Sequence, residues 1–159
     1  MDEEQSLNKA RQMVFRLLTY RARSKKEVRD YLDKKGFGDR IIKETIRDME
    51  YYGYVDDDRF ARDFVTYRKE RGYGLIRIRY ELQLKGIEND IIDRWLDEYF
   101  DSDEDLERIK EILDRRASGK NDSAAGDERW MKREAAFLKR RGFQDHLILT
   151  ALKNYNITK

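Results

Sequence analysis

The sequence contains no cysteine and no proline, and it has one histidine among 159 residues. The absence of cysteine excludes disulfide bonds, thiolate metal ligands and a cysteine nucleophile. The absence of proline removes the strongest helix breaker and favours a helical chain whose turns are made by glycine and polar residues. His146 is predicted on the outer side of a helix with no catalytic partner nearby. We therefore predict a protein that is not an enzyme and that uses no cofactor or metal.

Long apolar runs are also missing. No segment has the length and hydrophobicity of a membrane span or of a signal-peptide core, so we expect a soluble, cytoplasmic protein. Charged residues make up 43% of the chain and hydrophobic residues 39%. This composition leaves little material for one thick core and favours several thin cores in an elongated molecule.

One short pattern occurs three times, as Gly36-Phe37, Gly86-Ile87 and Gly142-Phe143. Each glycine follows a lysine or an arginine, and a leucine lies four residues before it. A pair of aliphatic residues follows the glycine, and a further apolar residue lies ten positions after it. The glycines are 50 and 56 residues apart. Such repetition is typical of proteins whose units bury their apolar faces against one another.

The apolar spacing predicts three helices in each unit. The residues after each glycine form a helical stripe, such as Ile42, Ile46 and Met49. A second helix precedes the glycine, which ends it in a left-handed conformation, and a third helix leads the unit. We predict an all-α fold, an elongated, curved tandem array of three three-helix repeats. The predicted repeats are residues 1–54, 55–100 and 101–159, the last with a mobile loop near 117–126.

Local motifs support these boundaries. Ser24-Lys25-Lys26-Glu27 matches a capping box, which predicts that a helix begins near Lys25. Gly72-Tyr73-Gly74 does not complete a dinucleotide-binding fingerprint, and we predict that it frees a helix start.

Aromatic residues surround Gly53, at Tyr51, Tyr52 and Tyr54. We predict that they pack to close the gap between consecutive units. Stacking on the bases of a single nucleic-acid strand is the alternative for them.

Charge alternates in sign along the chain, although the net charge is only +2. Residues 11–47 hold 12 Lys or Arg against 5 Asp or Glu, whereas residues 88–111 hold 3 against 11. The basic residues fall mainly on the first two helices of each unit, where they can meet phosphates or an acidic protein groove. The candidate partner-binding residues are Arg21, Arg23, Lys25, Lys26, Arg68, Arg71, Arg77, Arg79, Lys132, Arg133 and Arg140. For each of them, pairing with a nearby carboxylate on a solvated surface is the alternative.

Helix-turn-helix recognition of a DNA sequence is a rival interpretation of three-helix units. It requires the last helix of a unit to present basic or amide side chains to the major groove. The last helix predicted in the second unit is acidic, with Asp90, Asp93 and Asp97 near a single Arg94. Because this helix repels phosphates, weak nonspecific contact with DNA is the more plausible role.

Several motifs also resemble the signature of the RecX regulatory proteins. They are Arg21–Val28, Lys35-Gly36-Phe37, Gly53–Ala61, Gly72-Tyr73-Gly74 with Arg77–Arg79, Glu81-Leu82 with Lys85-Gly86-Ile87, and Arg140–Phe143. The resemblance covers roughly residues 10–155. It implies a tandem three-helix protein that lodges in the groove of the RecA recombinase filament on single-stranded DNA. Such a protein limits filament growth, ATPase activity and strand exchange in DNA repair and recombination.

The expected partner is therefore the RecA filament, with weak or indirect contact to single-stranded DNA, and we expect a monomer. The repeats alone leave another possibility open. A helical-repeat scaffold, or a nonspecific DNA-binding protein, can have the same architecture and a different partner.

Overall fold

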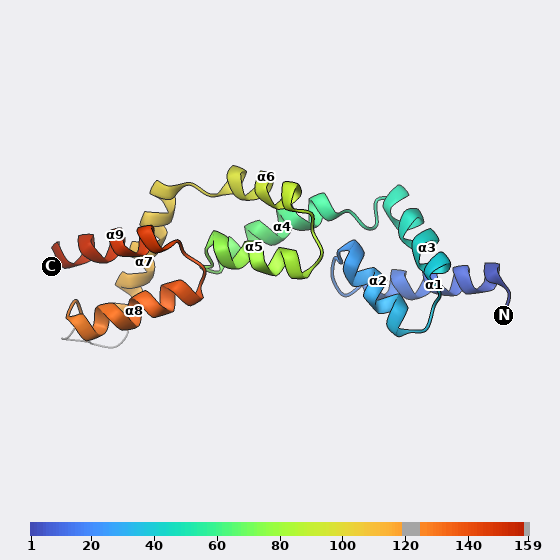
Figure 1. Ribbon diagram of the computed structural model, residues 1–159, viewed down its shortest axis with the longest axis horizontal. Helices are drawn as coiled ribbons and strands as arrows, with labels where there is room; N and C mark the ends of the chain where they lie inside the picture. Colours follow the sequence, from blue (N-terminus) through green and yellow to red (C-terminus); the bar gives the residue numbers. More distant parts are fainter. Residues whose placement is uncertain (119–124, 158–159) are drawn as a thin grey trace. The chain divides into compact units, whose positions relative to one another are not determined.

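The computed structural model describes residues 1–118 and 125–157 (Figure 1). These described residues form nine α-helices and no strand. The helices are α1 (Glu3–Leu18), α2 (Lys25–Lys34), α3 (Asp39–Tyr51), α4 (Asp57–Glu70), α5 (Leu75–Leu84), α6 (Asn89–Tyr99), α7 (Ser102–Ser118), α8 (Glu128–Arg140) and α9 (Asp145–Ile157). None of them is long and apolar enough to cross a lipid bilayer. The predicted all-α class and helical-repeat fold are confirmed, while the elongation and curvature stay predictions.

The nine helices form three consecutive groups of three, which we call triplets: α1–α3, α4–α6 and α7–α9. The repeated glycines, which we call the signature glycines, end the second helix of each triplet as predicted. Gly36, Gly86 and Gly142 have positive φ angles of 91°, 77° and 92°, in the left-handed region that glycine enters most readily. The leucine four residues before each glycine is completely buried in all three triplets. The repeated pattern therefore combines a helix end with a core position.

The packing of the chain divides it into two compact units, which do not coincide with the three predicted repeats. The first contains residues 1–63 and 82–92, and the second contains residues 64–81 and 93–159. The division passes through α4, α5 and α6, so each unit combines one terminal triplet with part of the middle one. The repeat boundaries at residues 54/55 and 100/101 stay predictions.

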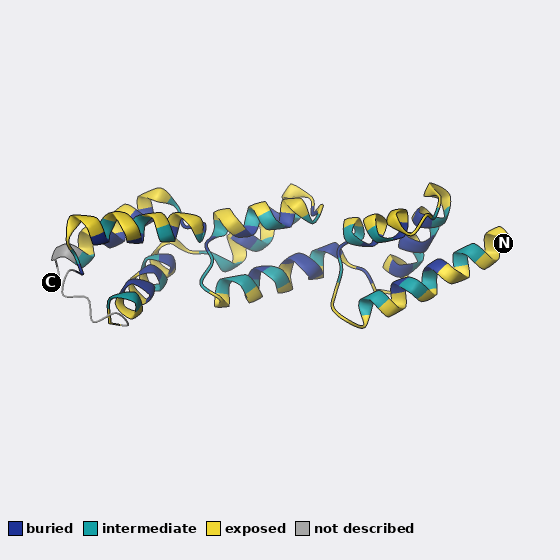
Figure 2. Ribbon diagram, turned by 90° about the horizontal axis from the view of Figure 1, so that it is seen from below, coloured by how far each residue is buried: buried dark blue, intermediate teal, exposed yellow. Residues whose placement is uncertain are grey.

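In the first unit, α3 packs against both α1 and α2. Figure 2 shows buried residues along one side of these helices and exposed residues along the other. The core contains Ala10, Val14, Val28, Leu32, Ile42, Ile46, Met49 and Val55. It includes the apolar stripe predicted for α3, and burial of each large aliphatic side chain stabilises the fold by about 1.5–3 kcal/mol.

In the second unit, α9 packs against both α7 and α8. Its core contains Ile109, Ile112, Leu113, Ala125, Trp130, Leu138, Phe143, Leu147, Ile148, Ala151 and Leu152. The Trp130 ring stacks on Tyr155, with 4.8 Å between the ring centroids. Helix α7 continues to Ser118, so the first two residues of the loop predicted at 117–126 are helical. Residues 119–124 of that loop lie outside the described residues.

The packing predicted for the tyrosines around Gly53 is wrong for Tyr51 and Tyr52. Their exposed fractions are 83% and 70%, and their rings contact each other edge to face. Tyr54 is half exposed and meets Phe15 of α1 edge to face, at a centroid distance of 4.9 Å. Val55, one residue further along the chain, lies in the core of the first unit instead.

Candidate functional site

In the first unit, the turn at Gly86 lies against the N-terminus of helix α2. Ser24 caps α2 by accepting a hydrogen bond from the Glu27 amide at 3.2 Å, which confirms the predicted capping box. The Ser24 hydroxyl also donates to the carbonyl of Lys85 at 2.7 Å. The next residue of that turn, Gly86, lies so close to α2 that an added Cβ atom would be 2.6 Å from the Cβ atom of Lys26.

The second unit repeats this arrangement with different residues. The Gly74 amide donates to the Arg141 carbonyl at 2.8 Å, and the Ile76 amide donates to the Gly142 carbonyl at 3.0 Å. Two amides at the start of α5, which lack partners within their own helix, are thereby satisfied by carbonyls at the end of α8. A Cβ atom on Gly142 would overlap the backbone of Arg77.

We call these two contacts the glycine junctions. In both, the turn of a signature glycine meets the N-terminus of the second helix from the preceding triplet. The contact positions are equivalent, because Ser24 and Gly74 each lie twelve residues before the glycine of their own triplet. The first glycine, Gly36, makes no such contact, since a Cβ atom added to it would meet nothing within 4 Å. The sequence-based interpretation assigned these glycines only the role of ending a helix.

The predicted cations of the first unit are largely engaged within it. Arg21 binds Glu27 through both terminal nitrogens, Lys25 lies 3.5 Å from Glu50, and Lys26 lies 3.0 Å from Asp30. Arg23 forms no ion pair among the described residues, and its Nε atom is buried without a hydrogen-bond partner. Burial lowers the pKa of Arg23, with the neighbouring Arg21 adding to the effect.

Glu27 connects several of these groups. Its carboxylate accepts hydrogen bonds from the Arg21 guanidinium and the Ser24 amide, and it lies 3.5 Å from the Lys85 ammonium. Burial by itself raises the pKa of Glu27, but the bonds from Arg21 and Ser24 and the charge of Lys85 outweigh it, so the pKa lies below its ordinary value. The ionised carboxylate therefore stabilises the folded chain.

Replacement of this carboxylate is expected to have a pH-dependent effect. A carboxyl group whose pKa is lower in the folded chain than in the unfolded chain stabilises the fold at pH values above its unfolded-state pKa. This stability is lost as the pH falls through its folded-state pKa. Glu27→Gln should lower the free energy of unfolding by about 1 kcal/mol at neutral pH, and the difference should vanish between about pH 5 and pH 2. Urea denaturation across this range measures it. The control Asp30→Asn removes an exposed pair and should change stability by less than about 0.5 kcal/mol; a constant deficit in Glu27→Gln would contradict the assignment.

In the second unit, arginines gather around Tyr73. The guanidinium of Arg68 lies 3.7 Å from the centre of the Tyr73 ring, that of Arg141 lies 4.5 Å away, and that of Arg77 lies 5.5 Å away. Arg68 also forms two hydrogen bonds to Glu81, at 2.8 and 2.5 Å, and only 18% of its side chain is exposed. Arg68 is thus a structural residue that holds α4 to α5.

The other predicted cations of this unit differ in how far they are neutralised. Arg79 is paired with Asp93, Lys132 with Glu128, and Arg133 with Glu134. Arg71 and Arg140 form no ion pair within the described residues, and both are exposed. They are the predicted residues of this unit that remain most available to a partner.

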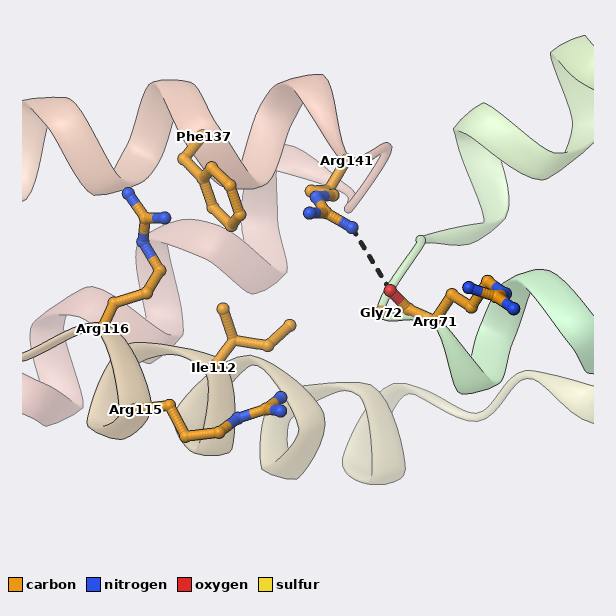
Figure 3. A pocket seen from close by; sticks show the side chains of 7 residues that line it. All are labelled: Arg71, Gly72, Ile112, Arg115, Arg116, Phe137 and Arg141. Carbon is orange, nitrogen blue, oxygen red and sulfur yellow. Dashed lines mark hydrogen bonds between the residues drawn. The ribbon is translucent and has the colours of Figure 1, made fainter. Parts of the chain in front are cut away.

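A surface hollow of about 280 Å³ joins Arg71 to arginines that the sequence prediction missed. It is lined by Arg71, Gly72, Ile112, Arg115, Arg116, Phe137 and Arg141, and we call it the arginine hollow (Figure 3). Arg141 carries a sequence signal, because a lysine or an arginine precedes each signature glycine, but it was not among the predicted partner-binding residues. Arg115 and Arg116 had no such signal beyond the basic composition of their segment.

The fold and these surfaces together define a class: a helical-repeat protein whose triplets meet at glycine junctions and whose second unit carries an arginine-rich hollow. Comparison with protein-family models makes this specific. The model of the RecX first three-helix domain matches residues 10–49, and that of the second three-helix domain matches residues 56–96. The chain belongs to the RecX family.

Similar proteins agree with this assignment. Regulatory protein RecX of Chlorobium phaeobacteroides is 34% identical over 91% of this chain and 91% of its own length. Regulatory protein RecX of Bacillus pumilus is 37% identical over 93% of this chain. The chain spans about half the length of the Bacillus pumilus and Caldanaerobacter subterraneus relatives, 56% and 54% respectively.

A solved structure shares the fold. The crystal structure of RecX from Lactobacillus salivarius superimposes with a TM-score of 0.80, at 22% sequence identity, over 97% of this chain and 99% of that one. This likeness extends the agreement to the fold over nearly the whole length of both chains.

Proposed function

We propose that this chain is a noncatalytic regulator that binds the RecA recombinase filament on single-stranded DNA and limits its growth, ATPase activity and strand exchange. The observation that carries the proposal is the match of both three-helix domains to RecX models, together with relatives named regulatory protein RecX over most of the chain. Action in DNA repair and recombination, in the cytoplasm, belongs to the same proposal.

The two compact units suggest how such a regulator acts. Each unit carries exposed cations, Lys26 in the first and Arg71 and Arg140 in the second. Two binding surfaces on one chain raise the effective concentration of the second contact once the first has formed. A chain that touches two neighbouring protomers constrains their relative orientation and so changes nucleotide turnover and protomer addition.

Cosedimentation tests the proposal directly. The full chain is mixed with RecA, ATP and single-stranded DNA, and in parallel with the same DNA alone. We expect it to pellet with the filament well above its recovery on naked DNA, and to reduce the ATPase rate as its concentration rises. Recovery equal to that on naked DNA, with an unchanged ATPase rate, would reject the proposal.

Arg140 provides a variant that is matched by a control on the next helix. Because Arg140 is exposed and forms no ion pair among the described residues, Arg140→Glu should leave stability within about 0.5 kcal/mol of the wild type. It should weaken filament binding about tenfold, since like charges facing each other across an interface repel. Lys153→Glu on α9 makes the same change of charge at an exposed site and should bind as the wild type does. Equal effects of both would indicate a general charge effect and contradict a role for Arg140.

The exposed tyrosines support the alternative of a scaffold with a different protein partner. Tyr51 and Tyr52 lie in an acidic segment, where residues 48–63 hold 6 Asp or Glu against 2 Lys or Arg. Tyrosine is enriched in protein interfaces, and the surrounding carboxylates disfavour phosphate. Cosedimentation separates the two functions, because a scaffold for another protein is not retained by the filament.

A further inference from the structure

More arginines line the arginine hollow than are paired with carboxylates of the second unit. Arg116 is paired with Glu134, whose side chain is only 2% exposed. Arg71, Arg115 and Arg141 form no ion pair within the part of the chain that the structure describes. Glu111 lies one turn before Arg115 on α7, yet it is beyond ion-pair distance. Basic residues near a helix C-terminus interact favourably with the helix dipole and stabilise the helix by about 0.3–1 kcal/mol each. That effect does not require the residues to line one common hollow.

The geometry limits which of these cations can reach a ligand. Figure 3 shows Arg115 and Arg141 extending toward the space beside Ile112 from two walls, whereas the head group of Arg71 points away over α4. Arg71 stacks on Tyr67, with 4.3 Å between its guanidinium and the ring centre. Two guanidinium groups, Arg115 on α7 and Arg141 after α8, therefore have donors to offer.

One wall of the hollow is held in place before any ligand arrives. The Arg141 Nη1 atom donates to the Arg71 carbonyl at 3.2 Å, and its guanidinium lies 5.0 Å from the centre of the Phe137 ring. On the other side of the hollow, Arg116 lies 3.6 Å from the same ring centre. Less conformational entropy is lost on binding when the receiving side chains are already ordered.

We propose that the arginine hollow binds a backbone phosphate of single-stranded DNA. A tetrahedral phosphate directs its oxygens in several directions and can receive guanidinium groups from two walls, whereas a planar carboxylate is commonly satisfied by one guanidinium. The hollow, at about 280 Å³, is larger than a phosphate group alone, and Ile112 and Phe137 give it an apolar wall beside the arginines. The space therefore suits a phosphodiester with its attached sugar. This site deepens the proposed function, because it supplies the DNA contact of a regulator that acts on a filament.

Direct binding to DNA tests the site without the recombinase. Binding of the full chain to labelled oligo(dT) is followed by fluorescence anisotropy at several salt concentrations. Arg115→Gln should weaken binding about three- to tenfold and reduce the slope of log K against log salt by about 0.7, the value for one phosphate contact on a single strand. Arg115 makes no side-chain bond within the described residues, so this variant keeps its fold. Arg141→Lys, which keeps the charge but loses the planar donor pair, should weaken binding in the same direction.

The control is Lys110→Gln combined with Lys153→Gln, which removes two exposed charges from the same unit outside the hollow. It should change the affinity less than twofold. Thymidine monophosphate as competitor distinguishes a free phosphate from a backbone phosphate, and it should displace the oligonucleotide only at much higher concentration.

The outcomes separate this proposal from the proposed function. Unchanged affinity of Arg115→Gln for oligo(dT), together with lost binding to the RecA filament, would assign the hollow to a carboxylate of the protein partner and overturn the phosphate site. Unchanged binding to both would overturn it as well. Reduced affinity for oligo(dT) in a chain that has no effect on RecA would uphold the phosphate site and reject the proposed function.

Discussion

Gly142→Ala is expected to lower the free energy of unfolding by about 2–5 kcal/mol. A φ angle of 92° costs an alanine about 1–2 kcal/mol. The added Cβ atom would also overlap the backbone of Arg77 at the start of α5, and such overpacking costs about 1–3 kcal/mol more. Urea denaturation followed by tryptophan fluorescence measures the loss, because both tryptophans of the chain, Trp95 and Trp130, belong to the second unit.

Gly36→Ala is a closely matched control. Gly36 has nearly the same φ angle, 91°, and the same place in its triplet, but no atom lies within 4 Å of a Cβ atom added there. Its replacement should cost only the conformational term of about 1–2 kcal/mol, measured by circular dichroism. An equal loss in Gly36→Ala and Gly142→Ala would show that the glycine junction adds nothing, and that both residues serve only to end a helix.

The elements of this fold were predictable because their signals are local. Helix α2 begins at Lys25 as the capping box predicts, since the Ser24 and Glu27 groups that fix this start lie within one turn. The stripe Ile42, Ile46 and Met49 is buried as its spacing predicts. A periodic apolar face and a left-handed glycine indicate a helix and its end from residues that lie within a few turns of one another.

The glycine junctions could not be predicted from the same signals. Gly74 was expected to free a helix start, and it does precede α5 directly, but its amide meets the carbonyl of a residue 67 positions later. The local periodicity of the sequence carries no information about a contact between residues so far apart. The equivalent twelve-residue spacing of Ser24 and Gly74 from their own glycines was visible, yet a serine and a glycine share no property that marks a docking position.

The basic surface was predicted as a composition, and packing decided which of its members are available. Arg68 is paired with Glu81 and stacked on Tyr73, so it holds helices together. Arg140, from an equally basic segment, is exposed without an ion pair among the described residues. The charge of a segment indicates a binding surface, but the approach of residues from other helices determines which charges remain for a partner.

Arg108→Met is expected to be the most destabilising change at a charged residue of the second unit. The Arg108 side chain is 15% exposed and bonds three groups: the Asp105 carboxylate at 2.9 Å, and the carbonyls of Lys69 and Tyr73 at 2.8 Å each. Methionine fills much of the same volume but leaves Asp105, whose side chain is 3% exposed, without its cation. Removing one partner of a buried pair costs about 3–5 kcal/mol, measured by urea denaturation.

Two comparisons separate the buried charge from a loss of packing. Arg108→Met with Asp105→Asn should recover a large part of the loss, because no unpaired carboxylate remains. Arg115→Met on the same helix, at an exposed site, should change stability by less than about 0.5 kcal/mol.

The deficit of Arg108→Met should also depend on pH. Burial raises the pKa of Asp105 above its ordinary value even with Arg108 present, and loss of the cation raises it further. A carboxyl group whose pKa is raised in the folded chain favours folding below that pKa, when it is protonated, and this contribution is lost as the pH rises through it. The gap between Arg108→Met and the wild type should therefore narrow as the pH falls from neutral toward about 4. A gap that stays constant over this range would mean that the two carbonyl bonds, rather than the buried carboxylate, account for the role of Arg108.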